Sequence, residues 1–246
     1  MCDTCGCGLP EEAKNRQQLE SISVMRGLMD SNNHQASHNR SHFERHEVLT
    51  INLMSSPGAG KTRLLEATID AIGSDCRIMV IEGDLETEND ASRIRARGVP
   101  AIQITTGSAC HLDARQIHQV LHDAPLADID ILFIENVGNL VCPASFDLGQ
   151  HLNVVLLSVT EGDDKPLKYP VMFRAADLVL LSKCDLLEVL DDFDCLRARE
   201  AVDRLGRKIP VVEVAAGRHT DIVSWLDWLK GALAERSRIN TLSGSI

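Results

Sequence analysis

The sequence is poor in aromatic residues and in positive charge. Aromatic side chains make up 3% of its 246 residues, which argues against surfaces on which nucleic-acid bases stack. Lys and Arg number 25 against 36 Asp and Glu, and the net charge of −11 would repel a phosphate backbone. We therefore expect no nucleic-acid partner.

Long apolar runs are also missing. The longest, such as 131–134 and 154–157, are far shorter than the roughly 20 residues that cross a bilayer. The start, MCDTCGCGLPEE, lacks the basic residues and apolar run of a secretion signal. We therefore expect a cytoplasmic protein with no membrane partner. Hydrophobic residues, at 44%, suffice for a buried core, which excludes overall disorder.

From residue 48 onward, apolar runs of strand length alternate with amphipathic stretches of helix length. The runs cover 48–54, 78–81, 101–105, 129–134, 154–159, 178–181 and 211–214. They are nearly continuous in Val, Ile and Leu, which is typical of parallel strands buried on both faces. Helices are expected near 61–72, 86–97, 113–122, 166–174, 194–205 and 219–234. The alternation predicts an α/β fold, a doubly wound, mainly parallel sheet of about seven strands with helices on both faces.

The two ends of the chain lack this alternation. Residues 1–46 are expected to hold a metal-binding tail, a helix over 10–30 and a polar linker or frayed helix end over 31–46. One domain is expected over 47–236, followed by a flexible tail over 237–246.

A phosphate-binding motif follows the first expected strand and opens the first helix. Residues 55–62 read SSPGAGKT, close to GxxxxGK[ST], with Ser55 in place of the first Gly. The positions expected to wrap the phosphates are Pro57, Gly58, Ala59 and Gly60. Lys61 can reach the β- and γ-phosphates, and the Thr62 hydroxyl can ligate Mg²⁺. The motif predicts a P-loop NTPase.

Acidic residues at the ends of two other strands complete such a site. Asp84 ends the second expected strand and Glu135 the fourth, at the sheet edge where ligands bind. We expect Asp84 to ligate Mg²⁺, and Asp84, Glu135 and Lys61 to act in hydrolysis. Nearby alternatives to Asp84 are Glu82, Glu86 and Glu88. Gly138 gives Glu135 an ExxG spacing, which resembles the DxxG segment that senses the γ-phosphate.

The nucleotide base is expected to bind after the sixth strand. Residues 182–185 read SKCD, which resembles NKxD with Ser182 in place of Asn. The Asp185 carboxylate can accept two hydrogen bonds from guanine, and adenine lacks this pair of donors. The stem of Lys183 would pack over the purine. We therefore expect GTP rather than ATP, and we expect the missing Asn to loosen this loop.

The eight cysteines favour metal or redox chemistry over disulfides in a cytoplasmic chain. Cys2, Cys5 and Cys7 form CxxCGC, whose three thiolates can wrap one Ni²⁺ or Zn²⁺ ion with the α-amine as fourth ligand. The alternative is an oxidisable tail with no dedicated metal.

A second set of metal ligands lies inside the domain. Cys110, His111 and Cys142 follow strands that should be neighbours, and they suit Zn²⁺ or Ni²⁺. Adjacent residues do not easily face one ion, so a site shared between two subunits would relieve the conflict between Cys110 and His111. The alternative is a pair of buried thiols. Because Cys142 lies in the segment expected to move with the γ-phosphate, metal affinity is expected to depend on the nucleotide.

Four histidines, His34, His38, His42 and His46, are spaced by four residues. On a helix, neighbouring pairs would share one face and could hold a metal ion. The surrounding Asn and Ser are poor helix formers, which favours a solvated linker.

Together these segments resemble the HypB family, the nickel-insertion GTPases of [NiFe]-hydrogenase maturation. The segments are CDTCGCG, SSPGAGKT, EGDLETENDASRI, GSACHLDA, FIENVGNLVCPASFDLG and LSVTEGDDKPLKYP. The resemblance covers residues 47–229 and the extreme N-terminus. It implies hydrolysis of GTP to GDP and phosphate, a high-affinity nickel site in the tail thiolates, and a metal site at the Cys-His-Cys set.

The resemblance also implies partners. It implies a GTP-promoted homodimer through Leu186 and Leu190, and nickel delivery with a small zinc-containing partner to the [NiFe]-hydrogenase large subunit. The residues alone indicate only that Leu186, Leu190 and Phe193 would share one side of a helix, which could instead pack on the core. The alternatives in function are a urease nickel GTPase, an iron–sulfur scaffold ATPase and a nickel store in which GTP is structural.

Overall fold

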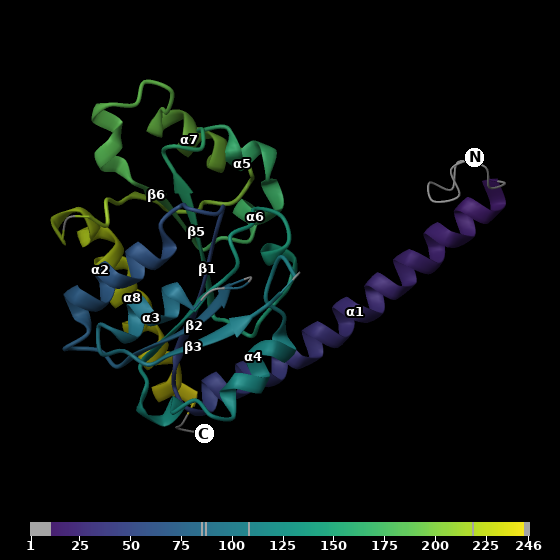
Figure 1. Ribbon diagram of the computed structural model, residues 1–246, viewed down its shortest axis with the longest axis horizontal. Helices are drawn as coiled ribbons and strands as arrows, with labels where there is room; N and C mark the ends of the chain where they lie inside the picture. The colour runs from purple at the N-terminus through teal and green to yellow at the C-terminus, as the bar shows by residue number, and fades with distance from the viewer. Residues whose placement is uncertain (1–10, 85, 87, 108, 218, 244–246) are drawn as a thin grey trace.

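The computed structural model describes residues 11–84, 86, 88–107, 109–217 and 219–243. Seven parallel strands form one sheet between layers of helices (Figure 1). The strands are β1 (Leu49–Ser55), β2 (Ile78–Asp84), β3 (Ala101–Thr105), β4 (Ile131–Glu135), β5 (Leu152–Ser158), β6 (Leu178–Ser182) and β7 (Val211–Glu213). Their order is β3-β2-β4-β1-β5-β6-β7, so the chain winds outward from β1 in both directions. The doubly wound parallel sheet is confirmed.

Helices cover both faces of this sheet. One layer contains α2 (Lys61–Ile72), α3 (Asn89–Arg95) and α8 (Val223–Ser243). The other contains α4 (Ala114–Leu121), α6 (Pro170–Arg174), α7 (Cys195–Asp203) and the end of α1 (Glu11–Arg45). Because successive strand residues point to opposite faces, Leu53 of β1 packs in the first layer and Met54 in the second.

Helix α1 is much longer than the sequence predicts, and it continues through the segment expected over 31–46 to be a polar linker or a frayed helix end. Its N-terminal part projects from the domain, whereas its C-terminal part lies on it beside α4 (Figure 1). The buried Asn39 Nδ2 donates to the carbonyl oxygens of Ala114, at 2.7 Å, and Leu148, at 3.1 Å. Tertiary contacts therefore compensate for the low helix propensity of this segment.

Two other helical stretches differ from expectation. The sequence predicts a flexible tail from residue 237, but α8 continues to Ser243. The helix expected over 166–174 is interrupted before Pro170, which divides it into α5 (Lys165–Lys168) and α6. A residue that precedes proline is disfavoured in helical conformation, which explains the break at Tyr169. Among the described helices, none has the length and apolar character needed to cross a membrane.

Candidate nucleotide and metal site

The phosphate-binding motif forms the turn between β1 and α2. Gly58 and Gly60 have φ values of +74° and +99°, which side chains rarely tolerate. The Lys61 ammonium donates to the Ser55 hydroxyl at 3.1 Å. Thr62 Oγ1 donates to Glu135 Oε1 at 2.8 Å. The turn thus places the lysine and the hydroxyl expected for a P-loop beside the carboxylate at the end of β4.

Buried carboxylates lie next to this turn. Glu82 of β2 and Glu135 of β4 are register partners and are 2% and 3% exposed. Their oxygens lie within 4.8 Å of each other and of an Asp90 oxygen. Within the described residues, one oxygen of Glu82 and one of Glu135 are buried without a hydrogen-bond partner. Such hard oxygen ligands suit a divalent cation such as Mg²⁺.

The electrostatics of these two glutamates favour a bound cation. Burial raises the pKa of Glu135. Burial, followed by repulsion from Glu135, raises the pKa of Glu82 to about 8. A divalent cation near both carboxylates would favour their ionised forms by direct charge attraction.

Asp84 is not a member of this cluster. It ends β2 two residues after Glu82 and is partly exposed, and its role in Mg²⁺ binding remains a prediction. Glu82 is predicted from the sequence only as an alternative to Asp84, and Asp90, which lies in the first turn of α3, is not among the predicted residues. The register of β2 against β4 decides which carboxylates meet, and a single sequence does not reveal it.

The segment after β4 contacts the phosphate-binding turn directly. The Asn139 N–H donates to the Ser55 carbonyl at 2.7 Å. A Cβ on Gly138 would lie only 2.7 Å from Pro57 Cα, so the two backbones are in close contact. The Asn139 side-chain oxygen also accepts a hydrogen bond from the Cys142 N–H at 3.4 Å. A continuous series of contacts therefore joins the phosphate-binding turn to Cys142.

The structure brings Cys110, His111 and Cys142 together, as the sequence predicts. Their ligand atoms lie within 4.8 Å of one another, and Cys110 Sγ is 3.6 Å from His111 Nδ1. The three ligand atoms come together within one chain even though Cys110 and His111 are adjacent, and a site shared between two subunits remains a prediction. The His111 ring stacks on Phe146 at 3.8 Å, and burial lowers its pKa. A neutral imidazole beside two thiols suits Ni²⁺ or Zn²⁺.

Asn136, which is not among the site residues predicted from the sequence, connects the two sites. Its side-chain oxygen accepts a hydrogen bond from the Leu112 N–H at 3.2 Å, and its amide donates to Asn52 Oδ1 at 3.2 Å. Leu112 directly follows His111, and Asn136 directly follows Glu135. This buried amide thus fixes the loop that carries His111 against the strand end that carries Glu135. A polar residue at the end of an apolar strand is the only sequence signal of this role.

The loop expected to bind the base lies beside the phosphate-binding turn. A cavity of about 210 Å³ separates them and is lined in part by Gly60, Lys183 and Asp185. The buried Ser182 hydroxyl donates to the Ala59 carbonyl at 2.7 Å. Ser182 therefore anchors the loop that the missing Asn was expected to loosen.

Two predicted features do not form a described site. Cys2, Cys5 and Cys7 lie outside the described residues.

The chain forms a 3₁₀ helix over Cys184–Glu188, which includes Asp185, and then an irregular segment, so Leu186, Leu190 and Phe193 do not share one side of a helix. Phe193 is buried in the core, whereas the exposed apolar side chains nearby are Val189, at 76%, and Leu196, at 70%.

Comparisons with known proteins identify the family. A sequence model of the CobW/HypB/UreG nucleotide-binding domain matches residues 49–213. The chain is 48% identical to hydrogenase maturation factor HypB of Escherichia coli K12 over 218 residues, which cover 89% of this chain and 75% of that protein. The chain belongs to the HypB family.

Two HypB crystal structures share the fold. HypB from Helicobacter pylori in complex with nickel has a TM-score of 0.79 and 41% identity, over 83% of this chain and 96% of that one. HypB from Archaeoglobus fulgidus has a TM-score of 0.76 and 37% identity, over 83% of this chain and all (100%) of that one. The family match begins at β1 and ends at β7, so it covers the whole sheet and both candidate sites.

Proposed function

We propose that this protein is a GTP-hydrolysing metallochaperone, which binds nickel and delivers it to the [NiFe]-hydrogenase large subunit during maturation. The observation that carries the proposal is the segment from Glu135 to Cys142. Its first residue contacts Thr62 of the phosphate-binding turn, and its last lies among three metal ligands. The names of the HypB relatives agree with this assignment.

GTP binding and hydrolysis are supported by the groups around the phosphate-binding turn. Lys61 and the backbone N–H groups of 58–60 would hold the phosphates, and Asp185 would select guanine. Thr62 and the carboxylate cluster would hold Mg²⁺, which supplies charge neutralisation when bound. A carboxylate oxygen of Glu82 or Glu135 without a partner is suited to orient the attacking water.

Nickel is the proposed cargo of the Cys-His-Cys site. Two thiols and an imidazole are ligands that both Ni²⁺ and Zn²⁺ accept. The hydrogen bond with Cys110, together with burial, raises the pKa of Cys142, so metal binding there would release a proton. The tail thiolates are proposed as a second nickel site, and a small zinc-containing protein as the partner in delivery.

The two sites are proposed to be coupled through Gly138 and Asn139. A γ-phosphate would attract the Gly138 amide, and Asn139 would transmit this movement to Cys142. Loss of one good thiolate ligand should weaken metal binding at least tenfold, or by about 1.4 kcal/mol. By reciprocity, bound metal must change GTP affinity by the same factor. Nucleotide state would also control dimerisation.

The test compares two variants in a chain with Cys2, Cys5 and Cys7 changed to Ser. Lys61→Ala is expected to lose GTP turnover and retain nickel binding at the domain site. Cys142→Ser is expected to lose nickel affinity and retain GTP turnover. Undiminished turnover in Lys61→Ala would contradict the hydrolysis site, whereas nickel binding without any GTP turnover in the parent chain would favour a nickel store.

A further inference from the structure

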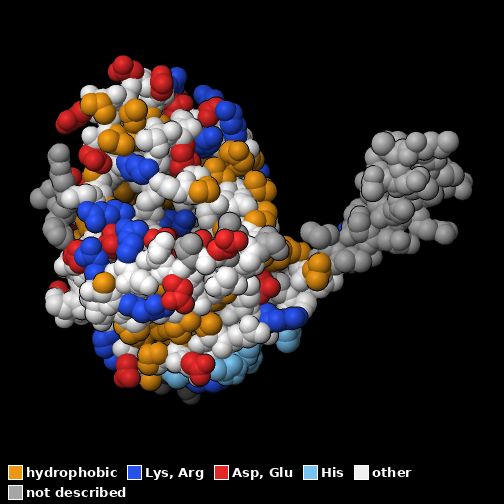
Figure 2. All heavy atoms as spheres, viewed as in Figure 1, with side chains coloured by type: hydrophobic (Ala, Val, Ile, Leu, Met, Phe, Trp, Pro, Cys, Tyr) orange, Lys and Arg blue, Asp and Glu red, His pale blue; other side chains and the backbone are white. Residues whose placement is uncertain are grey.

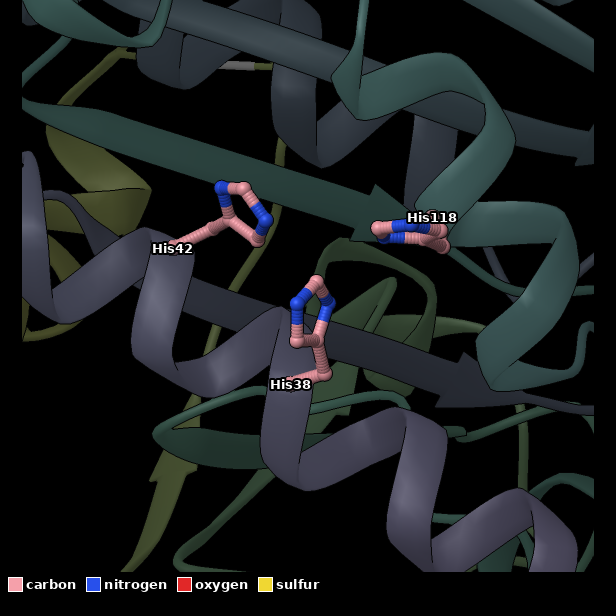
Figure 3. A group of neighbouring side chains, drawn as sticks. All are labelled: His38, His42 and His118. Carbon is pink, nitrogen blue, oxygen red and sulfur yellow. The ribbon is translucent and has the colours of Figure 1, made fainter.

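Three histidines meet on the surface where α1 lies against α4. His38 and His42 are one turn apart on α1, and His118 lies on α4, with the three rings arranged around one space between the helices (Figure 3). The ring centroids are 4.9 Å apart for His38 and His42, 4.9 Å for His38 and His118, and 5.8 Å for His42 and His118. Figure 2 shows histidine side chains gathered where α1 joins the domain.

We propose that His38, His42 and His118 form a binding site for one divalent transition-metal ion, separate from the Cys-His-Cys site. One ring nitrogen from each residue lies within 4.8 Å of the others. Nitrogens that share a tetrahedral Zn²⁺ ion, each bonded at about 2.1 Å, are about 3.4 Å apart. Small rotations of the three side chains would bring their ring nitrogens from within 4.8 Å of one another to this shorter distance. Imidazole binds Ni²⁺ and Zn²⁺ well, so these two ions are the candidates.

The backbones that carry these ligands are already fixed relative to each other. Asn39, which lies between the two α1 histidines, donates to the Ala114 carbonyl at 2.7 Å. The Ala114 N–H donates to Asn32 Oδ1 at 2.9 Å, so α1 contacts the first residue of α4 at two points. Ligands on helices that are already docked need little reorganisation to bind an ion.

The histidines are also suited to metal binding by their environment. Nδ1 of His118 is buried and has no hydrogen-bond partner in the part of the chain that the structure describes. Burial, reinforced by the neighbouring imidazoles, lowers the pKa values of His42 and His118. Neutral rings at pH 7 retain the lone pair that a metal ion requires.

A metal ion here would join the N-terminal helix to the nucleotide-binding domain. The complete site exists only while α1 is docked on α4, because His118 is the only one of the three on α4. An ion that binds only the docked arrangement stabilises that arrangement by mass action. The site therefore acts as a metal-dependent clasp, which holds the C-terminal part of α1 against α4. Because α1 is 35 residues long, its N-terminal end precedes the domain by more than thirty residues.

The direct test is a metal titration of the full chain with its thiolate sites removed. The residues changed to Ser are Cys2, Cys5, Cys7, Cys110 and Cys142. Calorimetry with Ni²⁺ and with Zn²⁺, in excess Mg²⁺ to occupy the carboxylate cluster, is expected to detect one bound equivalent. His118→Gln should weaken binding at least tenfold, whereas the control His34→Gln, at an exposed position one turn before His38, should leave it unchanged. Absence of the bound equivalent, or equal losses in the two variants, would overturn the proposal.

A second measurement keeps all the cysteines, in case their replacement impairs folding. Backbone hydrogen exchange over residues 32–43 is compared with and without excess metal. Metal is expected to slow exchange in the wild-type chain and in His34→Gln, but not in His118→Gln. The thiolate sites are identical in all three chains, so the comparison isolates the histidines. An unchanged exchange rate in the wild type, or equal protection in His118→Gln, would also overturn the proposal.

Discussion

Gly138→Ala tests the contact between the phosphate-binding turn and the segment that follows β4. The added Cβ would lie 2.7 Å from Pro57 Cα and 2.9 Å from Pro57 N. Ordinary contacts between carbon atoms are about 3.5–4.0 Å, so the backbones must separate by about 1 Å. The φ value of Gly138 is outside the positive region, so steric overlap is the sole cause of the effect. The substitution therefore displaces the turn that holds the phosphates.

The expected loss follows from the cost of overpacking, about 1–3 kcal/mol. If this strain falls on the nucleotide-bound arrangement, GTP affinity decreases about 5- to 150-fold. Titration with a fluorescent GTP analogue measures the loss, and thermal unfolding reports any separate loss of stability. The control is Gly231→Ala on α8, where an added Cβ has no neighbour within 4 Å among the described atoms. Wild-type GTP affinity in Gly138→Ala would refute the role of this contact in nucleotide binding.

Three other predictions concern the base, the pH dependence of stability and the dimer. Asp185→Asn is expected to weaken GTP and favour a xanthine nucleotide, and equal binding of ATP and GTP by the wild type would contradict the guanine assignment. Burial lowers the pKa of His151 to about 4, so the folded protein favours the neutral imidazole. The free energy of unfolding should therefore decrease by up to about 3 kcal/mol as pH falls from about 6.5 to 4, and this part should be absent in His151→Gln. Sedimentation should detect a dimer promoted by a GTP analogue, and Val189→Lys, between Leu186 and Leu190, should weaken it; a monomer at all concentrations would argue against this interface.

The strands could be predicted because their sequence signal is local. Buried parallel strands are nearly continuous in Val, Ile and Leu, and each predicted run overlaps an observed strand. The end of α1 gives no such signal, because Asn and Ser are poor helix formers. Its helix depends on hydrogen bonds between Asn39 and residues 75 and 109 positions away. Long-range contacts of this kind cannot be derived from local propensity.

In the candidate site, too, residues with a local sequence signal could be predicted, whereas residues that meet through long-range contacts could not. Lys61, Thr62 and Glu135 belong to a motif and to a strand end, and the structure brings them together as predicted. Whether Glu82 or Asp84 faces Glu135 depends on strand register, which the sequence does not determine. The histidine cluster requires both the unpredicted helix and its docking on α4, so spacing alone indicated only pairs of histidines.

Nucleotide state is proposed to control metal affinity at Cys110, His111 and Cys142. The most direct test is the nickel affinity of the GDP-bound and GTP-analogue-bound forms of a chain whose Cys2, Cys5 and Cys7 are changed to Ser. The contacts from the phosphate-binding turn through Asn139 to Cys142 predict affinities that differ at least tenfold. Equal nickel affinities in the two nucleotide states would contradict the coupling between the nucleotide and metal sites.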